Sequence, residues 1–180
     1  MLKIVTVPSN DLTQPTKPVV EVDDKIKKIV SEMKKVLIAQ NDPPGVGLAA
    51  NQVGLDLSIF IIKSTLKSKI KVFINPKILQ TTPYNLQPKQ KGRKKKIKLE
   101  GCLSIPRIWG PVKRAEKIFL EYQDLFGKKF VKWFLGFEAT IIQHEIDHLN
   151  GVVFTQRAIE QKGQIYREEN EELVKISLIS

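Results

Sequence analysis

The chain has 180 residues, with one Cys, two His and a formal net charge of +11 at pH 7. A single Cys excludes an intramolecular disulfide and four-cysteine zinc modules, and with two His it leaves at most one metal site built from nitrogen and sulfur ligands. One domain of this length buries roughly 70% of the surface that its unfolded chain exposes. We therefore expect residues 1–180 to form a single domain that needs no disulfide or structural metal.

No stretch reaches eighteen consecutive apolar residues, and the hydrophobic length near the N-terminus is too short for a signal peptide. We therefore expect a soluble, cytoplasmic protein with no membrane partner, and we expect it to be a monomer. In the reducing cytosol a lone thiol stays available as a ligand or nucleophile.

The first half of the chain contains four elements with clear patterns. Residues 2–7 alternate as a short strand does. Apolar residues spaced by 3.6 predict a helix over residues 23–40, with an acidic N-cap. Residues 45–52 are rich in Gly and Ala, which predicts backbone held close to another group. Residues 57–63 and 70–79 are rich in Ile, Val and Phe and predict β-strands.

The second half begins with a basic run, residues 89–98, that reads as a solvated loop or hairpin tip. Residues 117–123 and 128–134 flank Asp-Leu-Phe-Gly and predict a β-hairpin. Residues 137–150 are typical of a helix. The charged tail, residues 157–176, predicts a C-terminal helix.

Both histidines of the chain fall in His-Glu-Ile-Asp-His, residues 144–148. In a helix, His144 and His148 lie on one face, at the spacing that lets two imidazoles share one metal ion. Glu145 lies at the edge of that face, where it can act as a general base without being a ligand. The alternative is a pair of ordinary histidines on an amphipathic helix.

A third ligand is needed, and two sources are available. The downstream acids lie in the tail that reads as a solvated surface helix; they are Glu160, Glu168, Glu169, Glu171 and Glu172. Cys102 lies upstream in Glu-Gly-Cys-Leu-Ser, and a thiolate with two imidazoles and one open position makes a catalytic site. The alternative for Cys102 is a buried, inert side chain.

Three segments together resemble the three motifs of peptide deformylases in order and spacing. They are Gly-Val-Gly-Leu-Ala-Ala-Asn-Gln at residues 45–52, Glu-Gly-Cys-Leu-Ser at 100–104 and Gln-His-Glu-Ile-Asp-His-Leu at 143–149. The likeness covers nearly the whole chain. It implies an α+β fold in which mixed or antiparallel strands surround a central metal-binding helix, with one N-terminal and one C-terminal helix.

The resemblance also implies the reaction, which is removal of the N-formyl group from the initiator methionine of nascent chains. It assigns Cys102, His144 and His148 as metal ligands, Fe(II) as the usual ion, and Zn, Ni or Co as possible substitutes. Glu145 would take the proton of the attacking water. The Gln52 side-chain amide and the Leu103 backbone N–H would stabilise the charge on the formyl oxygen.

The predicted metal-binding helix also offers a substrate pocket. Phe137 and Ile141 precede His144 on one helix face, where a methionine side chain could lie, with Val46 closing the other side and Gly47 letting the peptide backbone approach. For these residues simple core packing is the alternative. The remaining pair, Glu100 and Arg114, would form an ion pair that braces the Cys102 loop.

Two other functions are compatible with part of this pattern. A zinc endopeptidase would share His144, Glu145 and His148 but has no use for Cys102 or Gln52. A non-enzymatic, ribosome-associated metal protein would have no use for Glu145. The run from Lys89 to Lys98 could contact ribosomal RNA near the exit tunnel, although most charge runs are only solvated loops. The resemblance to the family offers the C-terminal helix as an alternative contact with the ribosome.

Overall fold

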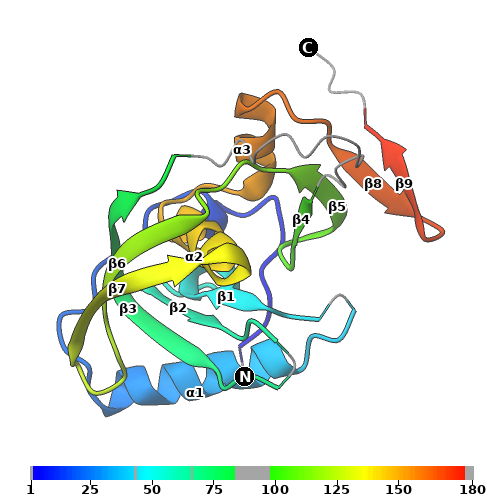
Figure 1. Ribbon diagram of the computed structural model, residues 1–180. Helices are drawn as coiled ribbons and strands as arrows, with labels where there is room; N and C mark the ends of the chain where they lie inside the picture. Colours follow the sequence, from blue (N-terminus) through cyan, green and yellow to red (C-terminus); the bar gives the residue numbers. More distant parts are fainter. Residues whose placement is uncertain (1, 43, 66, 84–97, 177–180) are drawn as a thin grey trace.

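The computed structural model describes residues 2–42, 44–65, 67–83 and 98–176. Two antiparallel sheets organise it (Figure 1). The larger sheet has the strand order β1-β2-β3-β6-β7, and its strands are β1 (Gly47–Ala49), β2 (Ile59–Ile62), β3 (Lys71–Thr81), β6 (Lys117–Gln123) and β7 (Lys129–Leu135). The smaller sheet has the order β4-β5-β8-β9, and its strands are β4 (Leu99–Cys102), β5 (Ile105–Pro111), β8 (Tyr166–Glu169) and β9 (Glu172–Lys175).

Within the described residues, three α-helices accompany the sheets: α1 (Asp24–Ile38), α2 (Gly136–Leu149) and α3 (Phe154–Glu160). Two 3-10 turns, Asn10–Leu12 and Ala50–Val53, lie in the connections. Figure 1 shows α2 among the strands and α1 along the outside of the molecule. This arrangement confirms the predicted class, antiparallel strands around a central helix, and the predicted N-terminal helix, whose N-cap Asp23 accepts a hydrogen bond from the Ile26 N–H at 2.8 Å.

Strand β2 explains why α2 is central. All four of its residues are buried, because alternate side chains enter two different apolar clusters. Ile59 and Ile61 pack with the apolar face of α1, and Phe60 packs with Ile141 of α2 and the aromatic residues of β3 and β6. A strand covered on both faces reads as an unbroken apolar run, which is what Ile-Phe-Ile-Ile is.

Two predicted elements are wrong. Residues 2–7 form no strand, because their backbone donors go to acceptors that do not belong to one neighbouring strand: Val5 N–H donates to the Gln52 carbonyl and Val7 N–H to the Ser104 carbonyl. The tail is not one helix over residues 157–176. Helix α3 ends at Glu160, and a hairpin of β8 and β9 follows.

The predicted β6–β7 hairpin is confirmed, with Gly127 at φ 74° in its turn. The predicted loop at residues 89–98 lies outside the described residues, apart from Lys98. Across the described part of the chain, every helix is too short or too polar to span a bilayer.

Candidate metal centre

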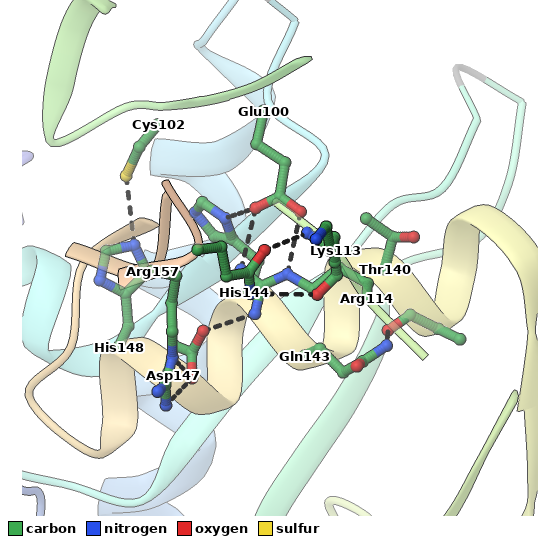
Figure 2. A network of polar contacts seen from close by, with 12 residues as sticks. Glu100, Cys102, Lys113, Arg114, Thr140, Gln143, His144, Asp147, His148 and Arg157 are labelled. Carbon is green, nitrogen blue, oxygen red and sulfur yellow. Dashed lines mark hydrogen bonds and ion pairs between the residues drawn. The ribbon is translucent and has the colours of Figure 1, made fainter. Parts of the chain in front are cut away.

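A tight turn between β4 and β5 presents the Cys102 thiol to α2. Cys102 is the last residue of β4 and pairs with Ile105, the first of β5. The turn directs the sulfur toward the helix, where Sγ lies 3.1 Å from Nε2 of His148 (Figure 2). Cys102 is a free cysteine, and its side chain is buried.

The two imidazoles come from successive turns of α2. The rings of His144 and His148 have centroids 5.0 Å apart and are nearly perpendicular, at 72°. One ligand atom from each ring and the Cys102 sulfur all lie within 4.8 Å of one another. A thiolate and two imidazoles are the donor set that a divalent transition-metal ion takes in catalytic sites, so these three side chains fit such an ion.

Proton positions in the metal-free centre follow from burial and neighbours. Burial disfavours a charged His144, yet its contacts with Cys102 and Glu100 prevail and raise the pKa of His144 well above its usual range. Burial and then the positive charges of His144 and Arg114 lower the pKa of His148. A ligating imidazole must be neutral, so uptake of a metal ion displaces a proton from His144.

Glu145 lies beneath the backbone of Gly47. A Cβ at Gly47 would stand 2.7 Å from the Glu145 carboxyl carbon and 2.9 Å from Cγ2 of Ile141, so only glycine leaves room for this carboxyl group. The side chain is buried, and among the described residues Oε2 has no hydrogen-bond partner. Burial raises the pKa of Glu145 to about 7, against the lowering effect of His144 and Arg114. The close backbone approach predicted for residues 45–52 is therefore present.

Gln52 is held by both ends of its amide. Oε1 accepts a hydrogen bond from the Ala49 N–H at 2.9 Å, which fixes the orientation of the amide group. Nε2 then lies 3.1 Å from Ser104 Oγ and 3.4 Å from Cys102 Sγ. A buried amide donor is thus placed beside the cysteine sulfur, and Leu103 follows directly on the same turn.

Glu100 and Arg114 form the ion pair expected from the sequence, and it is bidentate. Arg114 Nε and Nη2 each donate to one oxygen of Glu100, both at 2.9 Å, and Glu100 Oε2 also lies 3.0 Å from Nδ1 of His144. Burial alone would raise the pKa of Glu100, but Arg114 and His144 lower it to about 2. Glu100 therefore stays ionised and orients the ring of His144 through Nδ1.

A pocket of about 660 Å³ opens over these groups. The four substrate-contact residues expected from the sequence all line it, together with the site residues; they are Val46, Gly47, Phe137 and Ile141. Ile141 is buried and Phe137 is 54% exposed, so Phe137 stands at the edge of the pocket.

The sequence did not indicate a role for Trp109, which also lines this pocket. Its indole Nε1–H donates to Glu168 Oε2 at 2.7 Å, which joins it to the C-terminal hairpin. A Cβ at Gly101 would meet the indole at 2.8 Å. The one available signal was therefore this glycine inside a strand, since such glycines mark the close approach of another group.

A buried thiol and two imidazoles beside a carboxyl group are typical of metal-dependent hydrolases. The family model of polypeptide deformylases matches residues 1–164. The chain is 38% identical to a peptide deformylase of Borreliella burgdorferi, over 85% of each chain, and 36% identical to peptide deformylase 1 of Bacillus cereus, over 95% of this chain and 97% of that one.

Solved structures agree with this match. The peptide deformylase of Thermotoga maritima superposes with a TM-score of 0.74 at 32% identity, over 87% of this chain and 97% of that one. The peptide deformylase of Synechococcus elongatus, in complex with actinonin, superposes with a TM-score of 0.74 at 34% identity, over 87% of this chain and 78% of that one. The chain belongs to the peptide deformylase family. It is a metal-dependent hydrolase that removes the N-formyl group from an N-terminal methionine, and the endopeptidase and non-enzymatic alternatives are not supported.

Proposed function

We propose that Cys102, His144 and His148 hold one divalent metal ion, Fe(II) in the cell, and that the substrate is a formyl-methionyl nascent peptide. The observation that supports this proposal is the convergence of three ligand atoms within 4.8 Å beside a buried carboxyl group. A bound divalent ion lowers the pKa of its water and polarises the formyl oxygen. Zn, Ni and Co suit the same donor set and are the expected substitutes.

Glu145 is the general base and then the general acid. Its unpartnered Oε2 accepts a proton from the water whose oxygen attacks the formyl carbon. When the carbon–nitrogen bond breaks, Glu145 passes this proton to the leaving amine nitrogen. The products are formate and a free amino terminus. A pKa of about 7 in the absence of the ion suits a group that must both accept and donate a proton near neutral pH.

Gln52 and Leu103 stabilise the negative charge that develops on the formyl oxygen. The Gln52 amide is already oriented by the Ala49 N–H, which holds Nε2 beside the Cys102 sulfur. The Leu103 backbone N–H belongs to the turn that presents Cys102 and is fixed by the same strand pairing. Both donors are proposed to point at the oxygen rather than at the attacked carbon.

The pocket receives the methionine side chain. Ile141 and Val46 supply apolar walls, and Phe137 covers the outer end. An unbranched thioether adapts well to such a surface. The Gly47 backbone runs along the pocket without a side chain in the way, which leaves space for a peptide to lie edge-on.

Replacing Cys102 with Ala tests the metal assignment. We expect the variant to bind substantially less than one equivalent of metal and to release no measurable formate from formyl-Met-Ala-Ser under anaerobic, iron-loaded conditions. The wild type should bind one equivalent and release formate. Metal analysis and a formate assay on the same samples provide the measurement, and circular dichroism shows whether both proteins are folded.

If Cys102→Ala keeps both the metal and the activity, Cys102 is not a ligand of the metal ion. Cleavage of internal bonds in casein by the wild type, without formate release, would instead support a peptidase.

We also propose that the protein acts in the cytoplasm, as a monomer, at the ribosome near the exit tunnel. The basic run is the proposed contact, because lysine contacts to phosphate are strong and not sequence-selective. The C-terminal alternative no longer involves a helix, since that segment is the β8–β9 hairpin.

Changing Lys94, Lys95 and Lys96 to Gln is expected to weaken ribosome binding and to reduce its salt dependence, measured by co-sedimentation at several salt concentrations. An unchanged salt dependence would contradict the contact.

A further inference from the structure

Arg157 on α3 stands at the outer end of a chain of charged contacts that ends on a proposed metal ligand. Its Nη2 lies 2.9 Å and its Nε 3.2 Å from Asp147 Oδ1. Asp147 Oδ2 accepts a hydrogen bond from Arg114 Nη1. Arg114 holds Glu100, which lies 3.0 Å from His144 Nδ1. Figure 2 shows this path running from α3 across α2 to the ring of His144.

The inner contacts of this path are buried, and its outer end is open to solvent. The side chains of Glu100, Arg114, His144 and Asp147 are only 9–12% exposed, whereas Arg157 is 37% exposed. Each carboxylate in the path uses both oxygens. Asp147 divides its two oxygens between the two guanidinium groups, so Arg157 holds the orientation in which the carboxylate meets Arg114.

We propose that Arg157 is a positioning residue for the metal centre, which it orients through Asp147, Arg114 and Glu100 to His144. The proposal rests on the metal site described above. A guanidinium suits this role because two of its nitrogens donate to one oxygen while a third, Nη1, reaches Glu160 on the same helix at 3.3 Å, so that the side chain is held from both sides.

A simple charge effect predicts the opposite result. Without Arg157, the path keeps Arg114 with two carboxylates, Glu100 and Asp147, and so gains one net negative charge near the site. Negative charge alone would hold a cation more firmly. Loss of the orientation of His144 would instead weaken the binding of the metal ion. The direction of the change therefore separates the two effects.

The test is the rate at which Co(II)-loaded protein loses its metal to excess chelator, followed through the thiolate-to-cobalt charge-transfer absorption. Removing a partner that touches a ligand typically costs 10–100-fold in metal affinity or activity. Because Arg157 acts through three residues, we expect Arg157→Ala to lose Co(II) about 3- to 10-fold faster, with shifted cobalt d–d bands and a lower kcat at a similar KM.

Three variants make the result specific. Arg157→Lys should recover part of the loss. Glu160→Gln leaves the contact of Arg157 with Asp147 intact, and its amide oxygen can still accept the hydrogen bond from Arg157 Nη1, so it should match the wild type. Arg167→Ala removes an arginine with an exposed partner, Glu169 at 3.6 Å, and should also match the wild type. If Arg157→Ala does not fold, Asp147→Asn, which keeps the volume but alters one oxygen, should show the same direction with a larger effect.

Unchanged or slower metal loss in the folded variants, with unchanged cobalt bands, would overturn the proposal even if their melting temperature falls. Absence of the charge-transfer absorption in the wild type would overturn the metal centre itself, which is a different failure.

Discussion

Replacing Glu145 with Gln will slow formate release by about 10²–10⁴-fold in kcat while leaving one equivalent of metal bound. The amide matches the carboxylate in size but cannot take the proton of the attacking water. Glu145 is not part of the group of three ligand atoms, so the metal should stay. Steady-state kinetics with formyl-Met-Ala-Ser and metal analysis of the same sample provide the measurement.

The matched control is Glu138→Gln, which changes another carboxylate of α2. Glu138 pairs with Lys71 and is not among the residues that line the pocket. Its kcat should equal that of the wild type. An active Glu145→Gln enzyme would show that another group, or water alone, carries the proton.

Glu145→Gln should also stabilise the metal-free protein at alkaline pH. The pKa of Glu145 is about 7 in the fold and 4.5 ordinarily, so its carboxyl group favours folding below pH 4.5 and loses this contribution as pH rises through 7. The shift corresponds to about 3 kcal/mol. In urea unfolding, Glu145→Gln and wild type should therefore be similar at pH 4.5 and differ most above pH 8.

Replacing Arg114 with Met will destabilise the protein by about 3–5 kcal/mol, because it leaves two buried carboxylates, Glu100 and Asp147, with less compensation. Methionine retains an apolar stem of similar length, which limits the loss to the charge. The measurement is urea unfolding of metal-free protein at pH 7. Arg167→Met, which removes an exposed ion pair, should change the stability by less than about 1 kcal/mol.

The pH dependence provides a second check on Arg114. The pKa of Glu100 is about 2 in the fold against 4.5 ordinarily, so the stability from its contacts is complete above pH 4.5 and is lost as pH falls toward 2. The difference between wild type and Arg114→Met should shrink over the same range. A constant difference would indicate that the lost packing, rather than the ion pair, causes the destabilisation.

The centre could be predicted from the sequence to the extent that its groups are spaced along one helix or lie in one short segment. His144, Glu145 and His148 are local, and Cys102 was the one remaining soft ligand. Trp109 and Arg157 could not be found in the same way. Their partners, Glu168 and Asp147, are specified by how the smaller sheet and α3 pack, and no spacing along the chain encodes that contact.

The two wrong elements have physical reasons of the same kind. The N-terminal residues alternate like a strand, but the N–H groups of Val5 and Val7 donate to the carbonyls of Gln52 and Ser104, which do not belong to one common strand. In the tail, the charged residues show no alternation that would indicate strands, and β9 is exposed along its whole length. Tyr166 pairs with Trp109 of β5, and the turn at Asn170 and Glu171 has positive φ at both residues, so a distant strand and a tight turn determine the hairpin. The local helix propensity of Glu and Lys did not prevail there.

The placement of the single thiol on a sheet and of both imidazoles on a helix gives the proposed centre a mechanical role. A metal ion held by Cys102, His144 and His148 cross-links the smaller sheet to α2. Oxidation of that sulfur would therefore remove one link between the smaller sheet and α2 as well as stop the chemistry, and the contact of Glu100 with His144 would remain. The melting temperature should then rise with the concentration of free metal ion, because the ion binds only the folded chain.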